Sequence, residues 1–421
     1  MKNKLDKIIK SKVFKNSIWL TVLQFVNTII PTFTIPYITR ILGTEQYGIF
    51  SKALNWIIYF QVLVEFGFGL TGARKTAIIR EKENLQELFN NIISARILLL
   101  VFSFILMNII SFFSNFDIIT YVCMNLLFIM IIGTTFQLTW LFQGKQDMKF
   151  ITIINTISRI ISICLIFIFV KTKNDVLLYS FLYSVTLFIS SFISMVVAYK
   201  KYKLKFTFSK LNDIKKEIIE GKYLFYSSAI SKVFSGIGIT ILGFFSTNSM
   251  VGIYSALTKI PFVLNVAFSP ISQALFPFCS LKFKESKKIG IKTVKKIFLY
   301  VFCVYFIISF ILILLNEGIV NILFGKEYLT YSKALLPLVI QFLFAIINNF
   351  IGVQILVASG NQKRYSKAFS LSCVAMIILN IFLGKFFDIY GVSMASLCGE
   401  FILTLLLIYQ FKCFKEGVIN D

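Results

Sequence analysis

The sequence of 421 residues contains no histidine and only 19 acidic residues against 43 lysines and arginines. The absence of histidine excludes histidine-based catalysis and histidine proton relays. The seven cysteines are scattered and never spaced as Cys-X-X-Cys, so we expect neither structural disulfides nor a zinc site. A Walker A loop, a metal-ligand cluster and a nucleophile beside a suitable base are also missing. We therefore predict that the chain is not an enzyme and needs no cofactor.

Long polar segments are missing too, and apolar segments fill the chain instead. Hydrophobic residues make up 57% of the sequence, and the mean hydropathy is +0.82. Runs of about 20 apolar residues predict membrane-spanning helices, and no connection between them could hold a folded soluble domain. Twelve such runs occur, at 17–38, 48–70, 90–113, 118–142, 151–170, 176–199, 223–246, 250–276, 297–315, 333–357, 368–387 and 391–411. We predict an all-α integral membrane protein with twelve transmembrane helices.

The net charge of +24 comes mostly from the loops on one side of this arrangement. If residues 1–16 are cytoplasmic and the helices alternate, the loops on that side hold 32 basic residues and the opposite loops hold five. This imbalance is typical of cytoplasmic loops and places both termini in the cytoplasm. The charge therefore sets the topology, and nucleic acid is not an expected partner. No small-residue cleavage pattern follows the first apolar run, so we interpret it as a retained helix, not a signal peptide.

The longest polar segment, 200–222, divides the sequence into two sets of six helices. We expect lobes at 1–199 and 223–421, joined by a cytoplasmic linker helix at 200–222 in which apolar residues recur at helical spacing between lysines. This pattern favours a helix on the anionic inner leaflet, although a plain linker has the same composition. The lobes share a short repeat, with residues 47–51 opening the second helix and 251–255 opening the eighth. Two repeated halves with the substrate path between them are a recurring transporter plan.

Six basic residues lie inside or at the ends of apolar runs: Lys52, Arg96, Arg159, Lys232, Lys259 and Lys333. A charge at the bilayer centre costs about 2.5 kcal/mol or more, so such residues usually face a bundle interior or a water-filled cavity. Arg159, Lys232 and Lys259 lie near mid-span on polar stripes of the fifth, seventh and eighth helices. An interior biased toward positive charge favours an anionic cargo. The candidate substrate-binding residues are Arg159, Lys232, Lys259, Lys52, Asn155, Ser231 and Thr258.

Structural interpretations of these residues stay open. Serine and asparagine also hold membrane helices together. Lys52, Arg96 and Lys333 lie near helix ends, and we favour snorkelling to the interface for them. Glu65 and Glu400 are the acids well inside helices, where we expect charge pairing with a lysine, with proton uptake for ion coupling as the alternative. The residues expected to kink the first and eighth helices are Pro31, Pro36, Pro261 and Pro270.

Three segments resemble one transporter family. Residues 36–49, PYITRILGTEQYGI, resemble the junction of the first two helices in Wzx-type flippases of polysaccharide repeat units. Residues 140–149, WLFQGKQDMK, are similar to the region between the fourth and fifth helices of that family, and Asn155 and Arg159 follow them in the sequence. Residues 251–261, VGIYSALTKIP, resemble the start of its eighth helix. These flippases belong to the multidrug/oligosaccharidyl-lipid/polysaccharide (MOP) superfamily.

The resemblance implies two six-helix lobes in an inverted V, as in the multidrug (MATE) branch, within the bacterial plasma membrane. It implies that the chain moves undecaprenyl-pyrophosphate-linked oligosaccharides from the inner to the outer leaflet for O-antigen, capsule or exopolysaccharide synthesis. Membrane lipids, a polymerase and a chain-length regulator are the partners that go with this role. In this interpretation the cationic cavity offsets the desolvation of the pyrophosphate.

Two alternatives remain, one from the same superfamily and one from a different class. A drug or cation antiporter of the MATE branch tends to carry a carboxylate in the first helix, but residues 17–38 contain none. A polysaccharide polymerase or ligase would be expected to present a sizeable outer loop with catalytic residues. The longest outer connection predicted here is 316–332.

Overall fold

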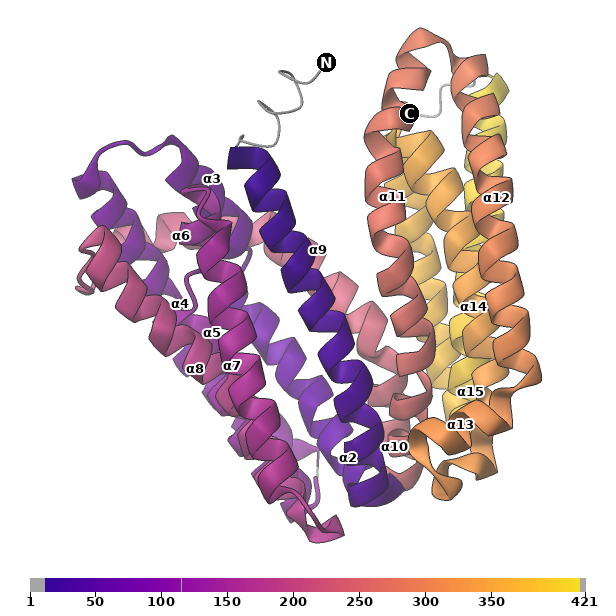
Figure 1. The fold of residues 1–421 in the computed structure, drawn as a ribbon, viewed down its shortest axis with the longest axis horizontal. Helices are drawn as coiled ribbons and strands as arrows, with labels where there is room; N and C mark the ends of the chain where they lie inside the picture. The colour runs from indigo at the N-terminus through magenta and orange to yellow at the C-terminus, as the bar shows by residue number, and fades with distance from the viewer. Residues whose placement is uncertain (1–11, 115, 417–421) are drawn as a thin grey trace. The chain divides into compact units, whose positions relative to one another are not determined.

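The computed structural model describes residues 12–114 and 116–416, so most of the predicted N-terminal segment 1–16 and residues 417–421 lie outside the described part. Within that part all regular structure is helical (Figure 1). The helices before residue 203 are α2 (Lys12–Glu65), α3 (Phe68–Ile78), α4 (Lys82–Phe113), α5 (Ile118–Phe136), α6 (Thr139–Gly144), α7 (Met148–Phe169), the 3₁₀ turn η1 (Lys173–Asp175) and α8 (Val176–Tyr202).

The later helices begin after a non-helical segment. They are α9 (Leu211–Phe245), α10 (Asn248–Leu257), α11 (Lys259–Glu285), α12 (Lys287–Leu314), α13 (Asn316–Phe324), the 3₁₀ helix η2 (Lys326–Ala334), α14 (Leu335–Asn348), the π-helix η3 (Asn349–Val357) and α15 (Gln362–Glu416).

The number of membrane-spanning helices is roughly consistent with the prediction of twelve. Among the described residues, ten segments are long and apolar enough to cross a membrane. Two of them contain a kink, where Gly43 in α2 (φ 71°) and Asp388 in α15 (φ 48°) adopt left-handed backbone conformations. The predicted all-α membrane fold is confirmed.

Backbone angles show where the two spans are interrupted. The α2 span is interrupted at Gly43, whereas Pro31 and Pro36 keep helical angles inside α2 and Pro270 lies inside α11, so bending at these three prolines stays a prediction. The eighth span is interrupted at Thr258, between α10 and α11. Pro261 follows three residues later and lacks the N–H that would bond the carbonyl of Leu257, which agrees with the break predicted for it.

The predicted linker helix at 200–222 is only partly helical. Helix α8 ends at Tyr202, residues 203–210 form a non-helical strap, and α9 starts at Leu211 and continues into the seventh span. The strap lies on α4, where Gln86, Asn90 and Ser94 share one face because they are four residues apart. Their side-chain oxygens accept the backbone N–H groups of Lys205, Thr207 and Ser209 at 3.0, 3.1 and 3.1 Å. These bonds replace the ones that a helix would make internally.

By its internal contacts the chain divides into two compact units. Unit 1 comprises Met1–Thr34 and Ile49–Ser235, and unit 2 comprises Ile35–Gly48 and Gly236–Asp421. In unit 1, α5, α7 and α8 pack together and α3 packs on α6; in unit 2, α11, α12, α14 and α15 pack together (Figure 1). The chain passes between the units inside α2 and inside α9, not in loops.

A glycine from each copy of the short repeat lies at one helix crossing in unit 2. A Cβ on Gly48 would lie 1.7 Å from the carbonyl oxygen of Asn248, and a Cβ on Gly252 would lie 2.0 Å from that of Thr44. Each glycine therefore faces the residue four positions before the other glycine. This reciprocal contact is the one expected when two related helices cross, and it requires small residues on both sides.

Candidate functional site

A pocket of about 370 Å³ lies at one end of unit 1, between breaks in two membrane helices. One break separates α2 from α3, and the other separates α5 from α6. Helices α4 and α9 complete the wall. The residues that line the pocket are Val62, Glu65, Gly67, Gly69, Leu70, Arg96, Thr134, Gln137, Thr139, Trp140, Gln143, Leu224 and Ser228. By the predicted topology this end of the unit is cytoplasmic.

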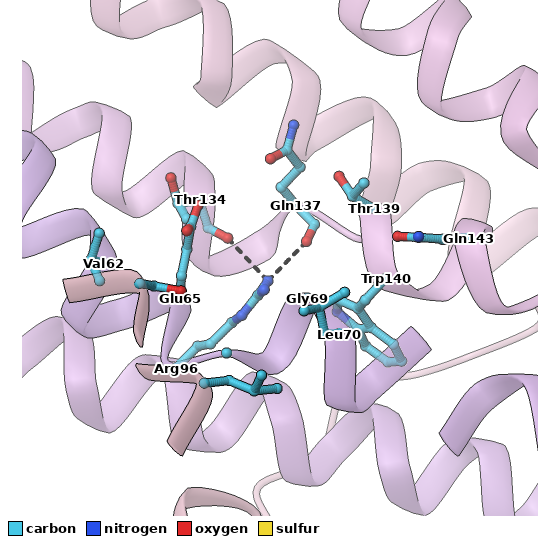
Figure 2. Close-up of a pocket in the computed structure, with 13 residues that line it drawn as sticks. Val62, Glu65, Gly69, Leu70, Arg96, Thr134, Gln137, Thr139, Trp140 and Gln143 are labelled. Carbon is cyan, nitrogen blue, oxygen red and sulfur yellow. Dashed lines mark hydrogen bonds between the residues drawn. The ribbon is translucent and has the colours of Figure 1, made fainter. Parts of the chain in front are cut away.

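Arg96 of α4 is the charged group at the base of this pocket. Its side chain is directed toward the end of α5, with Glu65 to one side (Figure 2). Its Nη1 donates to the carbonyl oxygens of Thr134 at 3.1 Å and Gln137 at 2.9 Å. Helix α5 ends at Phe136, so the Gln137 carbonyl has no helical donor, and the Thr134 carbonyl accepts the N–H of Gln137 at a long 3.4 Å. A cation at a helix C-terminus also complements the helix dipole.

The expectation that Arg96 snorkels to the interface is therefore wrong. The residue is only 4% exposed, because it donates to carbonyls at the break between α5 and α6, which lies inside the predicted continuous span 118–142. Its Nε has no hydrogen-bond acceptor among the described residues, and neither does the buried Nε1 of Trp140, which also lines the pocket. Two buried donors without an acceptor thus belong to residues that line the pocket.

The rim of the pocket has an unusual backbone. Phe66 and Gly67 both have positive φ, at 41° and 76°, immediately after Glu65 ends α2. A left-handed conformation is costly for a residue such as Phe66, by roughly 1–3 kcal/mol, and such strain concentrates at binding sites. Helix α9 holds the turn in place, because the Phe66 ring stacks on Phe225 with centroids 4.4 Å apart. A Cβ on Gly67 would lie 2.6 Å from Cβ of Leu224, so the turn has no room for a side chain.

Close packing and an ion-pair cluster hold α3 beside the pocket. A Cβ on Gly144 of α6 would lie 2.7 Å from the carbonyl oxygen of Ala73 in α3, so the two helices are in direct backbone contact. Lys75 of α3 lies 2.8 Å from a carboxylate oxygen of Glu217 and 3.0 Å from one of Glu220, both in α9. Helices α3, α6 and α9, which all line the pocket, are thus fixed to one another within unit 1.

The polar side chains of the predicted stripe on the fifth membrane helix, α7, mostly form hydrogen bonds with other residues of unit 1. Asn155 donates to the carbonyl of Ile151 at 2.7 Å and accepts from Gln137 at 3.2 Å. The hydroxyl of Ser162 donates to Leu182 of α8. Arg159 is partly buried, and its Nη1 donates to the carbonyl of Asn27 at 3.2 Å.

The other predicted binding residues lie apart from this stripe. Lys232 and Ser231 are exposed on α9 in unit 1. Thr258 and Lys259 lie in unit 2 at the α10–α11 break, where Thr258 donates to the carbonyl of Ser255. Lys259 is partly buried and forms no hydrogen bond or ion pair within the described part of unit 2. Lys52 lies 5.1 Å from the ring centroid of Phe116.

The two intramembrane acids have different surroundings. Glu65 is exposed to the pocket beside Arg96. The carboxylate of Glu400 accepts a hydrogen bond of 2.7 Å from Asn348, whose own oxygen accepts from Thr404 at 2.8 Å. Counting only described residues of its own unit, neither acid lies within ion-pair distance of a lysine or arginine. Charge pairing of these acids stays a prediction.

Comparison with known proteins identifies the family. Residues 13–283 match the family described as polysaccharide biosynthesis protein. The chain belongs to this family. Proteins to which it is similar include a putative O-antigen transporter of Escherichia coli strain K12, 29% identical over 95% of this chain and 96% of that protein. The capsular polysaccharide biosynthesis protein CapF of Staphylococcus aureus is 22% identical over 94% of this chain and 99% of CapF.

Two solved structures show the same fold at low identity. An inward-facing MATE multidrug transporter of the MOP superfamily matches with a TM-score of 0.68 and 12% identity, over 93% of this chain and all of that one. The lipid II flippase MurJ in an inward closed conformation matches with a TM-score of 0.67 and 17% identity, over 97% of this chain and 94% of MurJ. The resemblance seen in the sequence is confirmed, and this member of the family is a multi-pass membrane protein.

Proposed function

We propose that the chain is a flippase that moves undecaprenyl-pyrophosphate-linked oligosaccharide repeat units from the inner to the outer leaflet of the bacterial plasma membrane. The observation that carries the proposal is similarity along nearly the whole chain to proteins named for O-antigen transport and capsular polysaccharide biosynthesis. The fold that the chain shares with the lipid II flippase MurJ supports the same conclusion. The product enters surface polysaccharide, so a polymerase and a chain-length regulator are the partners.

The mechanism is alternating access with a cationic path for the head group. A pyrophosphate loses its hydration when it leaves water, and charge-assisted hydrogen bonds to cations offset that cost. Arg159 and Lys259 suit this role because both are partly buried in membrane helices, and Lys259 has no internal partner in the described part of its unit. Lys232 supplies a third cation from an exposed position on α9. The lipid tail stays in the bilayer throughout.

Export of cationic drugs is the competing function, and the match to a MATE transporter favours it at the level of the fold. A cationic cargo needs a buried carboxylate, and residues 17–38 of the first helix supply none. Glu400 of the last helix is already hydrogen-bonded to Asn348. The charge inside the membrane helices therefore fits an anionic cargo better.

The test is deletion of the gene in its own host. We expect lipid-linked repeat units to accumulate on the inner leaflet and surface polysaccharide to disappear, with both restored by the gene on a plasmid. Leaflet position is measured by the access of an added glycosidase or lectin to the units in intact spheroplasts and in lysed ones. Units that reach the outer leaflet at the normal rate, in a strain without a second transporter of this family, would contradict the proposal.

A further inference from the structure

The pocket at the end of unit 1 gathers polar groups that the protein does not use for its own structure. Glu65, Thr139, Gln143 and Ser228 line it, and their side chains form no hydrogen bond with another described residue. The buried Nε of Arg96 and Nε1 of Trp140 have no acceptor in the described structure. Buried polar groups in native proteins are nearly always hydrogen-bonded, so these two buried donors on residues that line one pocket indicate a ligand there.

The charges in this pocket are close to balanced. Arg96 already donates to carbonyls at the end of α5, and Glu65 is close enough to interact with it electrostatically. A phosphate would meet the like charge of Glu65 and an arginine that is partly satisfied. A neutral ligand with several hydroxyl groups suits the site better, because each hydroxyl donates to Glu65 or Gln143 and accepts from Arg96, Thr139 or Ser228.

The pocket is also shaped by features that hold its groups in place. The volume of about 370 Å³ is at the lower end of the range typical of small-molecule sites, which is roughly 300–1,000 Å³. The left-handed turn at Phe66 and Gly67 fixes the direction of the chain after Glu65, and stacking on Phe225 of α9 fixes the turn. Trp140 and Gln143 come from α6, which lies against α3 through Gly144.

We propose that this pocket binds one neutral sugar ring of the lipid-linked saccharide, through hydroxyl hydrogen bonds to Glu65, Thr139 and Gln143. This inference rests on the proposed function. It assigns two tasks to different residues of the chain: the pocket binds the sugar, and the cations Arg159 and Lys259 bind the pyrophosphate. By the predicted topology the pocket opens where repeat units are assembled, so it is the first site that selects them.

The experiment measures sugar binding to the purified full-length protein in lipid nanodiscs by saturation-transfer NMR. The probes are glucose, galactose and N-acetylglucosamine, with inorganic phosphate as competitor. We expect at least one sugar to bind without displacement by phosphate. Thr139→Val and Gln143→Ala each remove one hydrogen-bonding group and should weaken that binding about fivefold. Thr330→Val, an exposed residue far along the chain from the pocket, is the matched control.

Glu65→Gln gives a readout that a purely structural role of Glu65 would not produce. The amide keeps an acceptor for the sugar, but it removes the negative charge that balances the positive charge of Arg96. Phosphate should therefore displace the sugar from this variant. Absence of binding by all three sugars would overturn the proposal, as would unchanged binding in both Thr139→Val and Gln143→Ala. Displacement by phosphate from the unmodified protein would make the pocket an anion site and overturn it too. The gene deletion uses no pocket variant, so failure of the flippase assignment is recognised separately.

Discussion

At the scale of single residues, arginines donate to backbone carbonyls, as Lys145 and Lys287 also do outside the apolar runs. Only six of the 43 basic residues are arginines, and three of these donate to backbone carbonyls: Arg40 to the end of α13, Arg96 to the end of α5 and Arg159 to α2. A guanidinium presents several donors in a fixed plane, whereas an ammonium is a point charge. In a lysine-rich sequence, an arginine inside an apolar run is a signal for such a role. That signal would have separated Arg96 from the lysines at helix ends.

Arg159 provides the prediction at this scale. Arg159→Glu should reduce transport more than Arg159→Gln, because glutamate repels an anionic head group as well as removing a donor. Loss of a charge-assisted hydrogen bond is worth about 1.5–3 kcal/mol, so we expect at least a roughly tenfold loss for glutamate and a smaller one for glutamine. The measurement is surface polysaccharide at matched membrane abundance. Lys385→Glu, an exposed charge reversal, should remain normal. Normal polysaccharide in both Arg159→Glu and Lys259→Glu would end the argument for a cationic path.

At the scale of helices, the reciprocal crossing of Gly48 and Gly252 makes a prediction about stability. Gly252→Ala would place a Cβ 2.0 Å from the carbonyl oxygen of Thr44, so the helices must separate. Overpacking of this kind typically costs about 1–3 kcal/mol. We expect a lower midpoint of thermal unfolding for the detergent-solubilised protein. Gly318→Ala in α13 is the control, because nothing lies within 4 Å of its Cβ and alanine favours a helix. Equal midpoints for the two variants would show that the crossing is not tightly packed.

The sequence predicted the spans well and their breaks poorly, for a physical reason. A bilayer demands about 20 apolar residues per helix, and this demand is local in sequence. The breaks depend on hydrogen-bond partners that are distant in sequence. Arg96 donates to carbonyl oxygens at the end of α5, and Gln86 and Asn90 of α4 accept backbone N–H groups of the strap. Helical periodicity in 200–222 was therefore a sound guide only after Leu211, where α9 begins. The pocket was missed because it forms at such breaks.

The strap at 203–210 makes a second prediction at this scale. The double substitution Gln86→Ala and Asn90→Ala removes acceptors for the N–H groups of Lys205 and Thr207. Each lost bond contributes about 1 kcal/mol, so amide hydrogen exchange in the strap should accelerate at least about fivefold. Asn84→Ala, on the same helix but bonded to Glu81, should leave that exchange unchanged. Unaltered exchange in the double variant would mean that other contacts, such as those of Leu204, hold the strap on α4.

At the scale of the whole molecule, the surface requires a membrane. Helix α12 exposes apolar side chains such as Leu299, Val304 and Ile311, which are 60%, 56% and 47% exposed. Soluble proteins rarely show apolar surface of this extent, whereas a lipid bilayer covers it without cost. Polar and basic residues gather in the connections at the helix ends, so the arrangement of charge decides which set of ends faces the cytoplasm.

The last prediction is this topology. Basic residues are retained on the cytoplasmic side, so the loops that hold Lys145, Lys210 and Lys363 should be cytoplasmic and those that hold Asp117, Lys173 and Lys326 should face outward. Single cysteines at these six positions, in a chain whose seven native cysteines are replaced, are exposed to a membrane-impermeant maleimide. Intact cells should label only the second group, and permeabilised cells should label both. One position on the wrong side would change the number of spans between it and its neighbours. Labelling of the first group in intact cells would invert the chain and place the sugar pocket on the side where no repeat units are made.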